Sequence, residues 1–341
     1  MKSLDRIRST IRFEETDRAP VFSHIFGFAS RIKRIPLKDY LSNGESLALC
    51  QLESWKRFGY DGVTAFADNS LEAEAIGARI SYNDNDEYPH IAEYCLNDIR
   101  HWKCLSMPDP EEDGRMPVLL DACSILRNEV GEETAVVGTV QGPMTLAGQL
   151  MGIEKLIYGI VDYPEAFWNL LNFTTQAMII FGKALIKAGA HVIHVFDPAA
   201  SCSVINKAVF SEYVLPHLKQ AFRAYKDSGE PLCWLNITGQ TEKILPLFPE
   251  TGADLFNLDY LVPISTAMEK LPHHCINGNI MPFSFISGKA KEIQREARDL
   301  LRETQSRGGF ILSPGCEIPL ESQVSNVEAM VKAVVEQSKI K

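Results

Sequence analysis

The residues of this sequence that could do chemistry stand directly after short apolar runs. Polar side chains occupy these positions along most of the chain, and the set comprises His24, Asp68 with Asn69, Gln141, Asp197, Asn236 with Thr238, Asp259, Asn279, and Cys316 with Glu317. Carboxylates and amides that converge on one pocket can hold the N–H groups of a heterocycle or move a proton. We therefore expect a binding or catalytic site built from several of these side chains.

Two carboxylates, Asp68 and Asp197, are the strongest acidic candidates. The segment VIHVFDPAAS carries an apolar run straight into Asp197, and VTAFADNS does the same for Asp68. Loops after strands are also rich in Asp and Asn because these residues cap helices and form turns. We expect that structural role for Asn69, Asp259 and Asn279, whereas for Asp68 and Asp197 a structural and a functional role both stay open.

The runs that precede these side chains have the character of buried strands. Most are nearly continuous in apolar residues, as strands covered on both faces are, and they span residues 19–25, 61–66, 134–140, 191–196, 232–237, 254–259, 274–280 and 310–313. Helical segments separate them. One is expected to begin at Pro164 and stop at Gly189, and the last to run from Ser325 to the chain end. Eight strands alternating with helices predict a (β/α)8 TIM barrel.

In such a barrel the side chains that follow the strands gather at one mouth, where the chemistry takes place. Residues 78–115 interrupt the alternation, and we interpret them as an insertion over this mouth within a single domain covering residues 1–341. A doubly wound open sheet would give the same alternation. However, FGFASR after the first run matches the dinucleotide-binding pattern G-x-G-x-x-G poorly. The barrel is therefore the preferred prediction.

Composition excludes several classes of protein. The chain has 341 residues, is 45% hydrophobic and carries a formal net charge of -10 without a block of Lys or Arg, which argues against nonspecific nucleic-acid binding. It has no signal-like segment and no apolar stretch of membrane-spanning length, so we expect a cytoplasmic protein. Eight cysteines without a C-x-x-C pair predict neither a disulfide framework nor a zinc ribbon. Buried packing roles are predicted for the cysteines Cys50, Cys123 and Cys275, and for the histidines His24, His191 and His194.

The candidate residues, with GPMTLAGQLMG (142–152), VFDPAAS (195–201), GNIMP (278–282) and LSPGCEIP (312–319), resemble the uroporphyrinogen decarboxylase superfamily. Within it the chain is similar to the corrinoid-dependent methyltransferases. The decarboxylases carry an Arg-rich N-terminal motif, a Tyr after the third strand and a His where Cys316 stands. This chain has PVFSHIFGFASR, Gln149 and Cys316 there and keeps only Asp68, so the comparison argues against decarboxylation.

The resemblance also bears on zinc. Members similar to the coenzyme M methyltransferases hold zinc with a His-x-Cys pair after strand five and the Cys of the Pro-Gly-Cys turn, and the zinc keeps the acceptor thiol as thiolate. In LCWLNITGQT this chain has Asn236 and Thr238 instead of that pair. An amide, a hydroxyl and one thiol are a poor set of zinc ligands. We therefore expect no zinc and no other catalytic metal.

The chain looks most like the methylcorrinoid:tetrahydrofolate methyltransferases that complete demethylation of glycine betaine and similar methylamines. The resemblance implies transfer of a methyl group from methylcob(III)amide to a ring nitrogen of tetrahydrofolate, with Asn236 and Asp197 as catalytic residues. The implied substrate-binding set is Asp68, Gln141, Asp197, Asn236, Thr238, Asp259, Asn279, Cys316 and Glu317. Because the chain lacks the Asp-x-His-x-x-Gly motif of corrinoid-binding domains, a separate corrinoid protein is the expected partner.

Two other functions stay open at this point. One is a zinc enzyme that methylates a thiol, with His24 or Glu317 completing the metal site. The other is a barrel without catalysis that binds a corrinoid protein or a tetrapyrrole.

Overall fold

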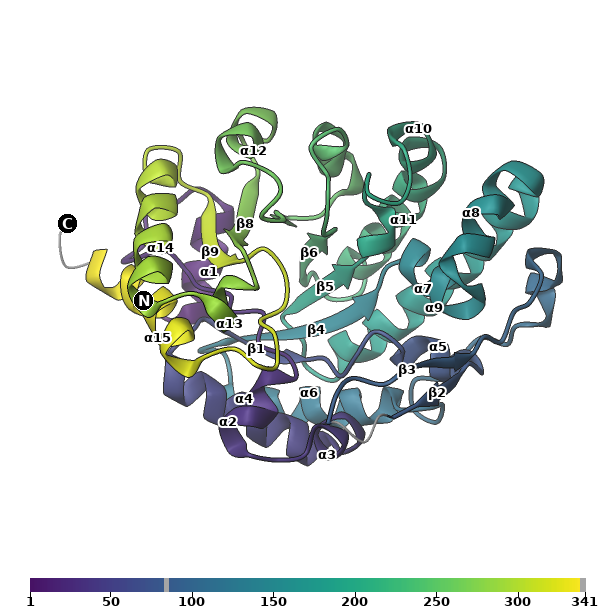
Figure 1. Cartoon of the computed structure of the whole chain (residues 1–341), viewed down its shortest axis with the longest axis horizontal. Helices are drawn as coiled ribbons and strands as arrows, with labels where there is room; N and C mark the ends of the chain where they lie inside the picture. Colours follow the sequence, from purple (N-terminus) through teal and green to yellow (C-terminus); the bar gives the residue numbers. More distant parts are fainter. Residues whose placement is uncertain (83–85, 338–341) are drawn as a thin grey trace.

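The structure, a computed structural model, describes residues 1–82 and 86–337 (Figure 1). Its centre is a curled parallel sheet in which neighbouring strands follow the order β1-β4-β5-β6-β7-β8-β9. These strands are β1 (Gly62–Ala65), β4 (Ala135–Gln141), β5 (Val192–Phe196), β6 (Leu232–Asn236), β7 (Leu255–Asn257), β8 (Cys275–Ile280) and β9 (Phe310–Pro314). All seven lie within or almost within the predicted runs, because the buried apolar stretches are long enough to identify each strand.

The prediction of a regular strand at residues 19–25 is wrong. The chain forms a single parallel bridge there, between Val21 and Leu312 of β9. The N–H of Phe22 donates to the Leu312 carbonyl (3.0 Å), and the N–H of Asp61 donates to the Val21 carbonyl (2.9 Å). This short stretch therefore lies between β9 and β1 and closes the sheet into the predicted barrel. It ends at His24, whose φ of 44° turns the chain out of the extended conformation.

Helices surround the sheet (Figure 1). The longer ones are α4 (Gly44–Phe58), α6 (Met116–Val130), α9 (Pro164–Lys187), α11 (Leu215–Lys226), α14 (Ala290–Thr304) and α15 (Val324–Gln337). The predicted start of α9 at Pro164 is confirmed, and Gly189 follows its end with a φ of 112° that favours glycine. Helix α15 begins one residue before the predicted Ser325, and residues 338–341 of the predicted helix lie outside the described residues.

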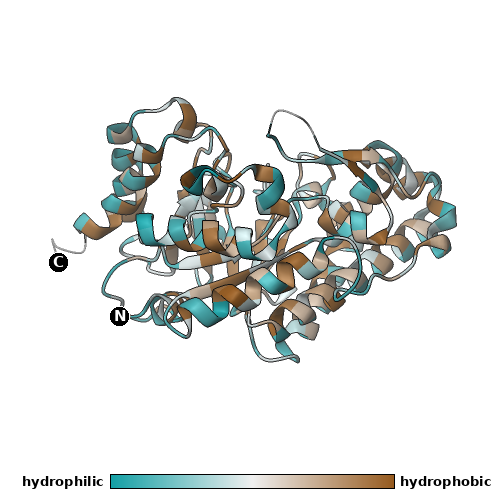
Figure 2. Ribbon diagram, turned by 90° about the horizontal axis from the view of Figure 1, so that it is seen from below, coloured by the Kyte–Doolittle hydropathy of each residue, from teal (hydrophilic) through white to brown (hydrophobic). Residues whose placement is uncertain are grey.

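Shorter elements complete the loops between these units. The short α-helices are α1 (Ser3–Ile11), α2 (Phe28–Lys33), α3 (Leu37–Ser42), α5 (Leu71–Ile76), α7 (Pro143–Met151), α8 (Ile153–Asp162), α10 (Lys207–Val209), α12 (Ile264–Lys270) and α13 (Ser284–Ser287). The 3-10 helix η2 (Pro198–Ala200) follows β5, and the 3-10 helix η4 (Leu245–Thr251) follows β6. The π-helical turn η3 (Phe210–Val214) lies between α10 and α11. Hydrophobic and hydrophilic residues alternate around many of the helices, as expected where one helical face covers a sheet (Figure 2).

The segment predicted to be an insertion, residues 78–115, contains elements that periodicity did not predict. Strand β2 (Arg79–Ser81) pairs antiparallel with β3 (His90–Glu93), and the 3-10 helix η1 (Ile99–Cys104) follows. Residues 83–85 of this segment lie outside the described residues. The N–H of Leu96 donates to the carbonyl of Leu150 at the end of α7 (3.0 Å), which ties the segment to a helix that follows a barrel strand.

The barrel interior is packed in layers. The lower layer, at the end of the barrel where the strands begin, is apolar. It contains Leu4 and Ile7 of α1 together with Phe22, Ala135, Val137, Val192, Trp234, Leu255, Cys275 and Ile311. Above it, side-chain hydrogen bonds link the strands: Trp234 Nε1 donates to Asn277 Oδ1 (2.9 Å), and Asn277 Nδ2 donates to Asn257 Oδ1 (3.0 Å). The interior thus becomes more polar toward the strand ends that form the mouth.

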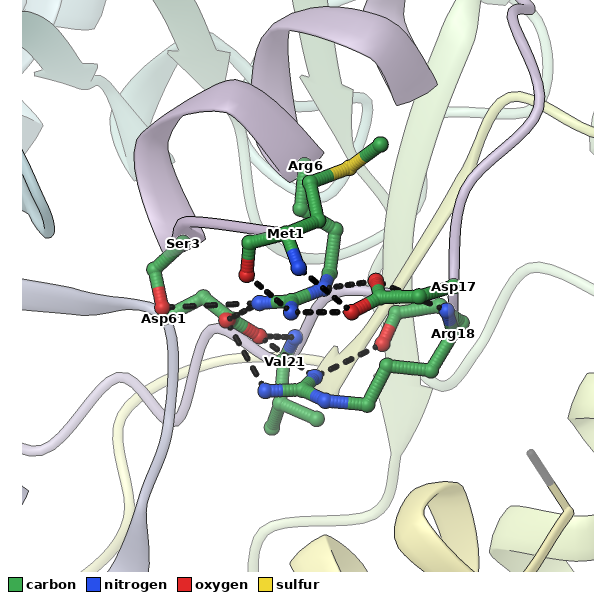
Figure 3. A network of polar contacts seen from close by, with 8 residues as sticks. Met1, Ser3, Arg6, Asp17, Arg18, Val21 and Asp61 are labelled. Carbon is green, nitrogen blue, oxygen red and sulfur yellow. Dashed lines mark hydrogen bonds and ion pairs between the residues drawn. The ribbon is translucent and has the colours of Figure 1, made fainter. Parts of the chain in front are cut away.

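A network of ion pairs fixes α1 at the opposite end of the barrel (Figure 3). Asp61, which is fully buried before β1, accepts hydrogen bonds from Arg6 (2.6 Å), from Arg18 (2.8 and 3.0 Å) and from the N–H of Val21 (2.7 Å). Arg6 also forms a two-bond pair with Asp17 (2.6 and 2.8 Å). Both oxygens of the buried carboxylate are therefore satisfied, and the first barrel segment is held beside β1.

The predicted burial of Cys50, Cys123, Cys275, His24 and His194 is confirmed. His191 is only half-buried and accepts a hydrogen bond from the N–H of Val136 (3.0 Å). Within residues 1–82 and 86–337, no helix combines the length and apolar character needed to span a bilayer.

Candidate active site

Two of the predicted site residues mark the ends of strands that flank β5. Gln141 ends β4 and Asn236 ends β6, and the strand between them, β5, ends at Phe196. The register pairs Gln141 with Phe196 and Phe196 with Asn236, so these three residues lie side by side at the mouth. The polar ends of β4 and β6 therefore lie at the same mouth of the barrel, on either side of Phe196.

Two amide oxygens at this mouth lack hydrogen-bond partners. Gln141 Oε1 and Asn236 Oδ1 are buried, and neither has a partner among the described residues; each residue is only 1% exposed. Buried polar atoms in folded proteins are nearly always hydrogen-bonded, because leaving one without a partner costs about 1–3 kcal/mol. We therefore expect a polar ligand or water to donate to these oxygens at the ends of β4 and β6.

Two histidines lie below these amides in the barrel interior. The rings of His24 and His194 are 6.0 Å apart, and both contact Trp234, at centroid distances of 4.9 and 4.2 Å. Thr139 Oγ1 lies 3.0 Å from His194 Nδ1. The other nitrogen of His194 and both ring nitrogens of His24 have no side-chain or backbone partner with good hydrogen-bond geometry in the described chain.

Burial sets the charge of these histidines. It lowers the pKa of His24 to about 4, against a smaller opposing effect of the Cys316 backbone, and it lowers the pKa of His194 well below its usual value. Both rings are therefore neutral at pH 7, and each offers one donor and one acceptor. The sequence did suggest buried histidines, but their unpartnered nitrogens were missed because these depend on the packing of three separate strands.

Asp197 has a different environment from the one predicted. Its carboxylate accepts from the N–H of Thr145 (2.7 Å), from the Thr145 hydroxyl (2.6 Å) and weakly from the N–H of Met144 (3.4 Å). It is fully buried, and burial raises its pKa to about 6 although these donors act in the opposite direction. Gly142 permits this contact, since a Cβ there would lie 2.2 Å from the Cβ of Asp197. Asp197 thus caps the first turn of α7, which is the structural alternative considered for it.

Asp68 forms a buried ion pair near the mouth. Arg115 donates to it with two nitrogens (2.5 and 3.3 Å) and also pairs with Glu74 (2.6 Å). The N–H and hydroxyl of Ser70 donate to the same carboxylate (2.8 and 2.5 Å). Arg115 was missed as a site residue because it stands at the far end of the predicted insertion, 47 positions along the chain from Asp68.

The expected structural roles of Asp259 and Asn279 agree with their contacts. Asp259 accepts from the N–H groups of Gly239 (2.8 Å) and Leu261 (2.9 Å), and Asn279 donates to the carbonyls of Asp259 (3.2 Å) and Val262 (2.7 Å). These bonds fix the loops after β6 and β7.

The two remaining predicted polar partners of the mouth differ in exposure. Asn69 is exposed and accepts from Gln141 Nε2 (3.3 Å), and Thr238 is half-buried beside Asn236. Both therefore lie at the edge of the site, and Asn69 is joined to the β4 end by a hydrogen bond.

A pocket of about 90 Å3 opens on this side of the mouth, and it is lined by Phe66, Asp68, Asn69, Tyr88, Pro89 and Glu317. Tyr88 belongs to the segment predicted to be an insertion. Its hydroxyl donates to Glu317 Oε1 and accepts from the N–H of Gly27 (2.7 Å). Burial raises the pKa of Glu317 to about 7. The pocket thus brings three of the predicted residues, Asp68, Asn69 and Glu317, together with a tyrosine that does not follow a predicted strand.

Glu72 of α5 is a second residue that the sequence did not reveal. It is 2% exposed and accepts from the N–H of Gln141 (2.7 Å). Burial raises its pKa to about 7. Glu72 therefore fixes the last residue of β4, but it was missed because it lies inside a helix and not directly after a strand.

The residues around Cys316 do not fit a zinc ion. Cys316 is half-buried, and burial raises the pKa of its thiol to about 12, so the thiol form dominates at neutral pH. In the described part of the chain, no three His, Cys, Asp or Glu side chains are placed to share a metal. Asn236 and Thr238 offer an amide and a hydroxyl, which are weak ligands for zinc. The donor set is therefore poor for this metal.

Comparison with known proteins adds the family. The model of the uroporphyrinogen decarboxylase (URO-D) family matches residues 2–337. A methylcobamide:CoM methyltransferase (MtbA) of Methanosarcina acetivorans is 27% identical over 275 residues, which cover 80% of this chain and 79% of the relative. A uroporphyrinogen decarboxylase of Carboxydothermus hydrogenoformans is 28% identical over 296 residues, or 85% of this chain and 82% of the relative.

A solved structure shows the same fold. A methyltransferase from Methanosarcina mazei superposes with a TM-score of 0.89 at 24% identity and covers 99% of both chains. The fold therefore extends over the whole barrel, including the mouth. The family match over residues 2–337 shows that the chain belongs to the uroporphyrinogen decarboxylase family.

Proposed function

We propose that this protein is a methyltransferase that moves a methyl group from a methylated corrinoid protein to tetrahydrofolate. Several relatives are named methylcobamide methyltransferases, which supports corrinoid as the methyl donor. The choice of acceptor rests on the mouth of the barrel. There the buried oxygen of Asn236 has no partner, and within residues 1–82 and 86–337 no set of zinc-like donors surrounds Cys316.

The chemistry of the acceptor agrees with this environment. A thiol must become a thiolate to be a good nucleophile, and zinc supplies that activation in thiol methyltransferases. The N5 amine of tetrahydrofolate is nucleophilic as a neutral group. It needs a fixed orientation and a route for the proton that it loses. Neutral hydrogen-bonding groups such as Asn236, Gln141 and the two buried histidines provide orientation without introducing charge.

In the proposed reaction the N5 lone pair attacks the methyl carbon of the methylcorrinoid. The carbon–cobalt bond breaks, and its electron pair stays on cobalt to give cob(I)amide. Asn236 holds N5 by its side-chain amide, so that the lone pair faces the methyl group as the charge on nitrogen develops. The corrinoid arrives on a separate protein that binds over the mouth.

The carboxylates that can contact the pterin ring are those that other parts of the fold do not already occupy. Because the Asp197 carboxylate is engaged by the first turn of α7, we assign it neither a pterin contact nor a catalytic role. Asp68 lines the pocket and pairs with Arg115, and we assign its carboxylate oxygens as acceptors for the pterin N–H groups. We place Gln141 and Asn236 against the same ring, from the ends of β4 and β6 on either side of β5.

Direct titration tests this assignment. Protein treated with a chelator is titrated with tetrahydrofolate and with 5-methyltetrahydrofolate in a calorimeter, and coenzyme M serves as the comparison ligand. We expect both folates to bind at micromolar concentrations and the thiol to bind far more weakly. Absence of folate binding, together with thiol binding that depends on added zinc, would contradict the proposal.

That outcome would favour a second candidate, a zinc-dependent methylcorrinoid:thiol methyltransferase. The observation in its favour is that several relatives are named for transfer to CoM. In this chain such an enzyme would need ligands other than Asn236 and Thr238. Metal analysis of the untreated protein separates the two candidates, since stoichiometric zinc required for activity would support the thiol enzyme.

A further inference from the structure

The proposed reaction leaves one chemical requirement without an assigned residue. The N5 atom of tetrahydrofolate carries a hydrogen, and after it accepts a methyl group it is a cationic ammonium. The neutral product forms only when that proton leaves. A proton acceptor at the mouth, within reach of a bound ring, is therefore needed.

Most ionisable groups near the mouth are unsuited to this task. Asp197 is engaged by the first turn of α7, and Glu72 lies behind the backbone of Gln141. Asp68 is paired with Arg115. His24 lies below the mouth, and burial opposes its protonation.

Glu317 differs from all of these groups. It lines the mouth pocket and is only half-buried, so a proton taken from a ligand can pass to solvent. In the described ranges, no Lys or Arg forms an ion pair with it, and Arg115, which pairs with the pocket residue Asp68, is also held by Glu74. Its carboxylate is therefore not neutralised by a cation.

Tyr88 fixes the orientation of this carboxylate. Its hydroxyl donates to Glu317 Oε1 and accepts from the N–H of Gly27 (2.7 Å). Gly27 has to be a glycine for this arrangement, because a Cβ there would lie 2.3 Å from the Tyr88 hydroxyl oxygen. Three separate segments thus converge to hold one carboxylate at the edge of the pocket: the first barrel segment, the segment predicted to be an insertion, and the turn after β9.

We propose that Glu317 is the proton acceptor of the methyl transfer and that Tyr88 is its positioning residue; this inference rests on the proposed function. As the N–C bond forms and the Co–C bond breaks, N5 becomes cationic and its proton moves to the free oxygen of Glu317. The products are neutral 5-methyltetrahydrofolate, cob(I)amide and protonated Glu317, which then releases its proton to solvent. In the reverse direction, protonated Glu317 supplies the proton that N5 needs before the methyl group leaves.

The reverse reaction offers a sharp test, since the need for a proton can be removed from the substrate. Demethylation by cob(I)alamin is followed with two donors: 5-methyltetrahydrofolate, and a tetrahydropterin with two methyl groups on N5, which is permanently cationic. The variants are Glu317→Gln and Tyr88→Phe. The control is Glu321→Gln, which changes an exposed carboxylate on the same turn.

We expect the wild-type protein to use both donors. Glu317→Gln should lower the rate with 5-methyltetrahydrofolate about a hundredfold, as loss of a general acid or base does, but stay within a few fold of wild type with the quaternary donor. Tyr88→Phe should show the same pattern with a smaller loss, about tenfold. Glu321→Gln should match wild type with both donors.

The contradicting results are equally distinct. Equal losses with both donors would mean that Glu317 supports the pocket structurally, and no loss with 5-methyltetrahydrofolate would remove it from the reaction. Either result overturns the proton-transfer role and leaves the folate methyltransferase intact. A wild-type protein that demethylates neither donor overturns the proposed function together with this role.

Discussion

Among single residues, Asn236 is the one whose environment points most directly to a ligand. The sequence identified it through its place after an apolar run, and the structure places its amide at the mouth with a buried oxygen that has no partner in the described chain. A purely structural amide would satisfy that oxygen within the fold. The missing partner is therefore expected to be a ligand.

Replacement of Asn236 by Ala tests this role. We expect turnover with tetrahydrofolate to fall about a hundredfold and the folate dissociation constant to change only a few fold, because the amide acts mainly as charge develops at N5. Rates and calorimetric affinities of both proteins give the comparison. Asn128→Ala, which changes an exposed amide on α6, is the control, and equal turnover of Asn236→Ala and wild type would refute the assignment.

Asp197 leads to a prediction about stability. Its carboxylate holds the first turn of α7 through Thr145 and Met144, so Asp197→Ala should lower the free energy of unfolding by about 2 kcal/mol. Urea unfolding measures this change. Folate affinity of the folded variant should stay near wild type, and a large loss of affinity with unchanged stability would restore the direct pterin contact.

Glu72 predicts how stability depends on pH. Burial raises its pKa from the ordinary 4.5 to about 7, so the folded protein holds this proton more tightly than the unfolded chain. Its contribution is complete below about pH 4.5 and is lost as the pH rises to about 7. The loss is on the order of 3 kcal/mol.

Glu72→Gln removes this titration while it keeps an oxygen for the N–H of Gln141. Compared with wild type, the variant should therefore gain stability between pH 5 and pH 8 in urea unfolding. Glu165→Gln, at an exposed position of α9, is the control and should follow wild type. A stability difference between Glu72→Gln and wild type that does not change with pH would show that Glu72 is already ionised at pH 5.

At the scale of elements, the sequence predicted the parts that have a continuous pattern. Strands β4 to β9 follow from long apolar runs, and α9 follows from Pro164 and Gly189. The first barrel segment did not become a strand because the chain turns at His24. The β2–β3 pair was not predicted, since its residues are mostly exposed and lack an apolar run.

Ion pairs between distant elements are a further limit of sequence reasoning. Arg6 and Asp61 lie 55 positions apart, and only the closed barrel brings them to 2.6 Å (Figure 3). Asp61→Asn should destabilise the protein by about 3 kcal/mol, because it leaves two buried or half-buried arginines without their shared anion. Thermal or urea unfolding measures the loss.

The same network contains its own control. Asp17 also pairs with Arg6, but its side chain is 44% exposed, so water can replace the interaction. Asp17→Asn should lower stability by less than about 1 kcal/mol. Equal effects of the two substitutions would mean that burial of Asp61 does not determine the strength of the network.

At the scale of the whole molecule, the barrel gives each end a different role. The lower end is closed by α1, its apolar layer and the Arg6–Asp61 network, which serve stability. The upper end collects neutral amides and imidazoles above a polar interior, and the segment predicted to be an insertion adds Tyr88 beside Glu317. This division matches a fold in which one mouth carries the chemistry.

The central claim is that the acceptor of the methyl group is tetrahydrofolate and that no zinc is needed. Single-turnover transfer from free methylcobalamin by chelator-treated protein tests it most directly, with tetrahydrofolate or coenzyme M as the acceptor and cobalamin absorbance as the readout. We expect rapid formation of 5-methyltetrahydrofolate and cob(I)alamin, with no methylated thiol. Transfer to the thiol alone, restored only by added zinc, would contradict it.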